Sequence, residues 1–151
     1  MIIAANTTSL LLCMLTEEHY ALPMSIVREV LRWRTPTAIP GTPPTIIGVI
    51  HQRGVVLPIV DVRPLLGLAT PAPTRSTRVI VIEQNGTQAG IISDAVADIV
   101  YVEPAAIEPP SALPSAQAHF LSGVVFYEDQ PVALLHVPAV FAAVTAVPDA
   151  T

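Results

Sequence analysis

The chain has no lysine and only one cysteine, and each of these shortages excludes a class of function. Seven basic residues, all arginine, stand against twelve acidic residues, and the net charge is −5. So acidic a chain offers no basic surface to nucleic acid and no polybasic membrane anchor. The single cysteine, Cys13, excludes an internal disulfide, and its apolar neighbours predict a buried, unreactive thiol. It also agrees with a reducing compartment, and we expect a cytoplasmic protein.

Long apolar runs are missing too, although hydrophobic residues make up 52% of the chain and charged residues only 13%. No positively charged segment precedes the apolar stretch at the N-terminus, so a secretory signal is not indicated. No apolar run reaches the ~18 residues that a membrane-spanning helix needs. A chain of 151 residues cannot easily bury so much apolar surface. Exposed apolar patches often mark contacts between proteins, and we expect such patches here.

The chain is rich in proline, a residue that the interiors of long helices exclude. The 16 prolines cluster mainly around residues 36–44, 71–73 and 104–114, and proline breaks helix interiors. Between the clusters lie short runs rich in valine, isoleucine and leucine, which are typical of β-strands. The sequence therefore predicts an all-β protein of short strands with short helical turns.

These runs predict strands at residues 9–15, 18–22, 26–32, 46–51, 55–60, 78–83, 88–93, 95–102, 124–127 and 132–136. Asn85-Gly86, between two of them, is a strong hairpin signal. A helical turn is expected at residues 62–66 and a short helix at 138–144, while 69–77 has the composition of a linker. Each half holds about five strands and a proline-rich segment. We therefore predict two small barrels, residues 10–68 and 78–137, within one domain over residues 1–151.

No residue pattern in the sequence is typical of catalysis or metal binding. Asp94 and Asp98 lie four apart on a predicted strand, where a shared solvent-facing side is expected rather than a pair of catalytic acids. The histidines are isolated, without the spacing of metal ligands: His19, His51, His119 and His136. We expect no enzyme, no cofactor and no metal. The alternative, a small β-barrel enzyme or ligand carrier, would need polar groups that converge in a pocket.

Residues 48–68, GVIHQRGVVLPIVDVRPLLGL, are the most informative segment. Two apolar strands flank a tight turn at Arg53-Gly54, where Gly54 supplies the positive φ that the turn needs. Arg53 lies between two runs that must be buried. We therefore expect a partner for its charge, since an unpaired buried guanidinium is costly. Such a module, without catalytic groups, is typical of a protein that presents a surface.

This segment, with G-V-I-H-Q-R-G followed by L-P-I-V-D-V-R and L-G-L, resembles the CheW-like domain family, the coupling proteins of bacterial chemotaxis. Y-A-L-P at residues 20–23, V-R-E-V-L at 27–31 and I-E-P-P at 107–110 extend the resemblance to roughly residues 10–141. It implies two small SH3-like five-stranded β-barrel subdomains packed together, and no catalysis. It also implies two partners, the cytoplasmic tip of a methyl-accepting chemoreceptor and the regulatory domain of a CheA-type histidine kinase.

The resemblance further implies the site residues. Glu29 and Arg53 would form an ion pair, and together with Val27, Val49 and Val56 they would border the receptor-binding groove. A purely structural salt bridge is the other explanation for the pair, and core packing for the three valines. The second barrel would meet the kinase.

Two further positions bear on the expected surface. Trp33 lies between two arginines, where an indole either anchors an interface or caps the barrel beneath a stacked arginine. His51-Gln52 stands where the family usually has Asn-Leu, and it places an amide beside the expected groove.

Overall fold

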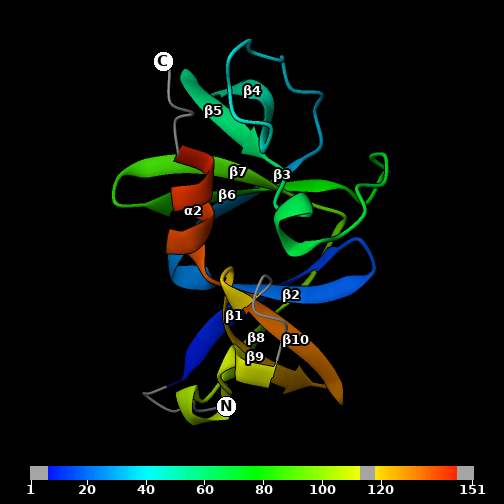
Figure 1. Ribbon diagram of the computed structural model, residues 1–151, viewed down its shortest axis with the longest axis vertical. Helices are drawn as coiled ribbons and strands as arrows, with labels where there is room; N and C mark the ends of the chain where they lie inside the picture. Colours follow the sequence, from blue (N-terminus) through cyan, green and yellow to red (C-terminus); the bar gives the residue numbers. More distant parts are fainter. Residues whose placement is uncertain (1–6, 113–117, 146–151) are drawn as a thin grey trace.

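The computed structural model describes residues 7–112 and 118–145, which form two five-stranded sheets stacked along the long axis of the molecule (Figure 1). The predicted all-β class with short helical turns is confirmed. The strands are β1 (Thr8–Leu15), β2 (Glu18–Pro23), β3 (Val27–Arg32), β4 (Ile46–Gln52), β5 (Val55–Val60), β6 (Arg78–Gln84), β7 (Thr87–Ser93), β8 (Ala95–Val102), β9 (Leu121–Tyr127) and β10 (Gln130–Leu135). The helical elements are η1 (Met24–Ile26), η2 (Pro64–Leu66), η3 (Pro104–Ala106), η4 (Pro110–Ala112) and α2 (Val137–Thr145).

The order of the strands defines the two units. Sheet I has the order β3-β6-β7-β5-β4, and sheet II has the order β8-β1-β2-β10-β9. Most neighbours are antiparallel, as expected, but each sheet contains one parallel pair inside its strand order: β5 with β7 in sheet I and β10 with β2 in sheet II. Sheet II therefore joins the beginning of the described chain to its end.

The predicted division into consecutive barrels at residues 10–68 and 78–137 does not match these sheets. β1 and β2, which the prediction assigned to the first barrel, pair with β8 and β10 in sheet II. β6 and β7, which it assigned to the second barrel, belong to sheet I. Hairpin signals are local, so they specify β1–β2 and β6–β7 as hairpins without specifying which sheet each hairpin joins. The physical units are β3–β7 on the one hand and β8–β10 with β1–β2 on the other.

The expected likeness of two halves is nevertheless present in this rearranged form. In each sheet a lone strand is followed by a proline-containing loop and a hairpin, and a second hairpin adds in parallel. The second hairpin follows along the chain in sheet I, where it is β6–β7, but comes from the start of the described chain in sheet II, where it is β1–β2. Each loop also makes one antiparallel bridge to the edge strand of its own sheet, Thr37 to Val49 in sheet I and Glu108 to Val124 in sheet II. These bridges pair part of an edge that would otherwise be open to aggregation.

Three apolar clusters hold the fold together. The largest lies between the sheets, where Leu11 and Leu15 of β1 meet Ile80 and Ile82 of β6, and α2 contributes Val140. Figure 1 shows α2 packed beside the sheets along the junction. The other two clusters fill the interiors of sheet II and sheet I separately. Alternate residues of β1 and β6 therefore face different clusters, which explains why both strands are apolar on both sides.

The interior of sheet I has no room for a side chain at Gly90. A Cβ atom at this position would lie 2.5 Å from Cγ1 of Val79 and 2.8 Å from Cδ1 of Ile59. Both contacts are far shorter than carbon atoms tolerate, and both side chains are fully buried. Glycine at this position lets β7 approach the filled interior.

We predict that Gly90→Ala destabilises the protein by about 1–3 kcal/mol, because the added methyl group overpacks the interior of sheet I. Ala97→Val, which adds carbon atoms to an exposed position of β8, is the control and should change stability by less than about 0.5 kcal/mol. Chemical denaturation followed by circular dichroism measures both. Equal stabilities of the two variants would contradict the packing argument.

Candidate partner-binding site

Glu29 and Arg53 lie together at one end of sheet I. Arg53 occupies the β4–β5 turn with a φ of +51°, and Glu29 extends from β3. Nη1 of Arg53 donates a hydrogen bond to Oε2 of Glu29 over 3.3 Å. The pair expected from the resemblance is therefore present.

The environment of this pair differs from the expectation that Arg53 is buried. Its side chain is 77% exposed, whereas that of Glu29 is 28% exposed. The turn carries Arg53 beyond the two apolar strands instead of between them. One exposed contact of this length contributes less than about 1 kcal/mol to stability. The fold therefore depends little on Arg53, which leaves the guanidinium available to a partner.

A hollow of about 180 Å³ lies beside the ion pair. Leu57 and Val81 contribute apolar surface, and the amide side chains of Gln52 and Gln88 contribute polar groups. Val55, which is half exposed, lines the same hollow. The site thus offers a small apolar depression bordered by two amides and an ion pair.

Gln52 has a structural partner in Arg34. Nη2 of Arg34 donates to Oε1 of Gln52 over 2.8 Å and to the carbonyl oxygen of His51 over 3.2 Å. Arg34 follows β3, so these bonds connect the segment after one edge strand of sheet I to the other edge strand, β4. Gln52, which stands where the family usually has leucine, therefore adds a polar connection beside the hollow.

The three valines assigned to the groove do not share one surface with the ion pair. Val27 packs against the cluster between the two sheets. Val55 and Leu57 face the hollow, so the alternation along β5 points Val56 to the opposite side, where it is 53% exposed and pairs with His51. Val49, two residues before His51 on β4, lies on that same outer side.

Trp33 is partly buried against the interior cluster of sheet I. It also lines a cavity of about 290 Å³ together with Ile47 and Ile92. Of the two explanations left open by the sequence, this packing supports a cap on the sheet rather than an exposed anchor.

The histidines remain apart from one another. Nδ1 of His136 accepts a hydrogen bond from the backbone N–H of Ala139 and so caps α2, and the ring of His119 packs edge-on against Phe120 with centroids 4.9 Å apart. Across residues 7–112 and 118–145, no three His, Cys, Asp or Glu side chains are placed to hold a metal ion.

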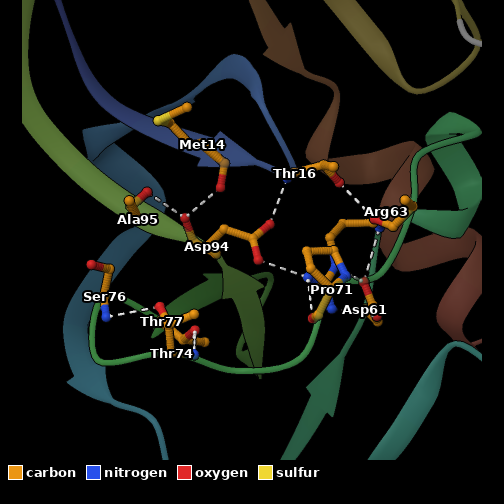
Figure 2. Close-up of polar contacts among 12 residues, drawn as sticks. Met14, Thr16, Asp61, Arg63, Pro71, Thr74, Ser76, Thr77, Asp94 and Ala95 are labelled. Atoms are coloured by element: carbon orange, nitrogen blue, oxygen red, sulfur yellow. Dashed lines mark hydrogen bonds and ion pairs between the residues drawn. The ribbon is translucent and has the colours of Figure 1, made fainter.

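A buried charged cluster around Arg63 was not foreseen from the sequence (Figure 2). Nε and Nη2 of Arg63 donate to the two carboxylate oxygens of Asp61 over 2.9 and 3.0 Å, and Nη1 donates to Oδ1 of Asp94 over 2.8 Å. The Arg63 side chain is only 6% exposed. Its hydrogen bonds to Asp61 raise the pKa of the guanidinium, burial opposes this rise, and the charges of Asp61 and Asp94 add to it. The guanidinium therefore stays charged at every accessible pH.

Asp94 also reaches sheet II. Its Oδ2 accepts a hydrogen bond from the backbone N–H of Thr16 in the β1–β2 turn, and its own N–H donates to the carbonyl of Met14 over 2.9 Å. Oγ1 of Thr16 in turn donates to the carbonyl of Ala69 over 2.6 Å. The predicted linker of residues 69–77 therefore lies against the β1–β2 turn at the junction.

The expectation that Asp94 and Asp98 share a solvated side is wrong for Asp94. Asp94 precedes β8, at the junction of the two sheets, whereas Asp98 lies within the strand and is exposed. One signal was available in the sequence, because Asp61 and Arg63 follow directly on a fully apolar strand. A charged pair at such a position is normally satisfied by further partners.

Cys13 lies in the cluster between the sheets and is 1% exposed. Burial raises the pKa of its thiol from 9.0 to about 12, against a smaller opposing effect of a hydrogen bond with Ser93. The thiol is therefore neutral over the physiological range, as the sequence predicted of an unreactive group. No helix within the described ranges has both the length and the apolar character to cross a membrane.

Comparison with known proteins shows to which family the chain belongs. The CheW-like domain matches residues 9–145 of the chain. The chain belongs to the CheW-like domain family. It is 32% identical over 126 residues to the chemotaxis protein CheW of Rhizobium meliloti, and 31% identical over 126 residues to a probable chemotaxis protein CheW of Rhizobium etli; each match covers 83% of this chain and 81% of the relative.

A solved structure supports the same assignment. The crystal structure of the scaffolding protein TtCheW from Thermoanaerobacter tengcongensis matches with a TM-score of 0.80 and 29% identity, over 86% of this chain and 84% of that one. As a CheW-like protein, the chain is a chemotaxis coupling adaptor. The alternative of a ligand-carrying barrel or an unrecognised enzyme is not favoured.

We predict that the thiol of Cys13 stays unmodified in the native protein at mildly alkaline pH, because it is both buried and neutral. A chromogenic disulfide reagent should react with less than about a tenth of the native thiol in the time that it fully labels denatured chain, because modification requires opening of the core. Fast and complete labelling of native protein would contradict the placement of Cys13.

Proposed function

We propose that this CheW-like chain joins the cytoplasmic tip of a methyl-accepting chemoreceptor to the regulatory domain of a CheA-type histidine kinase, without catalysing a reaction. Membership of the family supports this proposal, and the observation that carries it is the exposed Glu29–Arg53 pair beside an apolar hollow. A charged contact that stabilises the fold so little is well suited to a partner.

The receptor would bind at the β4–β5 end of sheet I. Val55 and Val56 are 51% and 53% exposed on either side of the hairpin, next to Arg53. Exposed valines beside an exposed arginine combine apolar contact with charge recognition, which is the composition of many interface centres. Glu29 would orient Arg53 toward the receptor.

The kinase would bind sheet II. Ile99 and Tyr101 on β8 are 43% and 55% exposed, and Phe126 on β9 is 64% exposed. Large exposed apolar side chains are unfavourable in water unless a partner covers them. These side chains are part of the large apolar content of the chain, which the described core does not bury entirely.

The mechanism would be positional. Two partner surfaces on one rigid body hold the receptor and the kinase at a fixed separation. Once one partner is bound, the second contact within an assembly becomes effectively intramolecular. Each single contact can therefore be weak while the assembly is stable.

We predict that Arg53→Glu leaves the fold intact but weakens receptor-tip binding at least about tenfold. The substitution places a second carboxylate opposite Glu29 and reverses the charge that meets the receptor. Stability should change by less than about 1 kcal/mol, because the lost contact is exposed. Pull-down and titration with the cognate receptor tip measure the binding.

Arg75→Glu is the matched control, since it makes the same change of charge at an exposed position of the 69–77 segment. It should bind the receptor tip like the unchanged protein. Unaltered receptor binding by a folded Arg53→Glu variant would reject this surface as the receptor site.

We also predict that the chain binds each partner modestly when alone and much more tightly when both are present, with a gain of about tenfold or more. Calorimetric titration of one partner, with and without a saturating amount of the other, measures the gain. Identical affinities in the two titrations would argue against the positional mechanism.

A further inference from the structure

The two sheets are held against each other mainly by apolar side chains. The cluster between them contains leucine, isoleucine and valine from β1, β6 and α2. Such contacts are strong but non-directional, so a small rotation of one sheet against the other changes the buried area little. Directional bonds restrict the relative orientation of the two sheets further than this packing does.

Arg63 supplies such bonds at the junction. It follows β5 of sheet I, where Asp61 holds its guanidinium by two hydrogen bonds in a fork. Its third nitrogen donates to Asp94, between β7 of sheet I and β8 of sheet II. Asp94 then accepts from the N–H of Thr16 in the β1–β2 turn of sheet II. As Figure 2 shows, one continuous series of bonds crosses from one sheet to the other.

We propose that Arg63 is a positioning residue: the series Asp61–Arg63–Asp94–Thr16 fixes the orientation of sheet II relative to sheet I, and so the spacing of the two partner-binding surfaces. The functional part of this inference rests on the function proposed above, while the structural part can be tested without any partner.

The energetics favour a geometric role. A buried ion pair seldom stabilises a fold more than apolar groups of the same volume would. The guanidinium nevertheless demands planar, directed acceptors, and one of these, Asp94, lies 31 residues away from Arg63 along the chain. Replacing the charged groups with neutral ones should therefore alter orientation more than stability.

The test uses a neutral triple variant, Asp61→Asn/Arg63→Met/Asp94→Asn, because Arg63→Met alone would leave two carboxylates without their cation. Asp94→Asn is the milder second variant, which keeps an oxygen for Thr16 and weakens the bond to Arg63. The control is Arg28→Met. It breaks the 2.6 Å ion pair with Glu83, which joins β3 to β6 within sheet I alone.

The first measurement is the relative orientation of the sheets, from backbone residual dipolar couplings of the full chain. In the unchanged protein and in Arg28→Met, one alignment tensor should fit both sheets. In the triple variant each sheet should require its own tensor, with a smaller difference in Asp94→Asn. A single tensor for both sheets in the triple variant and in Asp94→Asn would overturn the proposal, and should the triple variant not fold, Asp94→Asn decides.

The second measurement is binding of the receptor tip and the kinase regulatory domain. Each affinity alone should stay within about twofold of the unchanged protein, because neither surface is altered. The gain in affinity when both are present should fall about fivefold or more. A full gain together with separate tensors would overturn the functional part. Failure of the unchanged protein to bind either partner would reject the proposed function and leave the orientation result standing.

Discussion

The apolar layer between the two sheets is the constraint on which the rest of the structure depends. The central residues of β1 and β6 are buried on both faces, so these positions must be apolar, and the polar groups of the backbone must be satisfied within the sheets. This requirement accounts for a composition that is half hydrophobic. Among the described residues, the charged side chains therefore lie mostly at the surface, apart from the cluster around Arg63.

Local structure was largely predictable because its signals are local. Gly54 and Gly86 adopt the positive φ expected of tight turns, and the strands lie close to the predicted bounds. The pairing of β2 with β10 was not predictable from the pattern, because it joins segments more than a hundred residues apart and leaves no local trace. The parallel pair of β2 with β10, together with the pairing of β1 with β8, assembles the second sheet from both ends of the described chain.

The candidate site, too, was predictable only in part. Glu29 and Arg53 came from the resemblance, and their contact is present in the structure. Whether Arg53 is buried depends on how far the turn extends beyond the sheet, which no pattern of residues states. For Asp94 the error was one of position: a shift from the interior of β8 to the junction before it changes a solvated residue into a partly buried hydrogen-bond partner of Arg63.

Exposed and buried ion pairs thus have different uses in this molecule. The Glu29–Arg53 pair is exposed, adds little to stability and can be exchanged for contacts with another protein at small cost. The Asp61–Arg63–Asp94 cluster is shielded from water, so its bonds remain directional and cannot be exchanged. An adaptor needs both properties at once, a surface that can exchange contacts and a frame that keeps its surfaces in register. Under the roles proposed above, the two needs belong to different arginines, Arg53 in the β4–β5 turn of sheet I and Arg63 at the junction of the sheets.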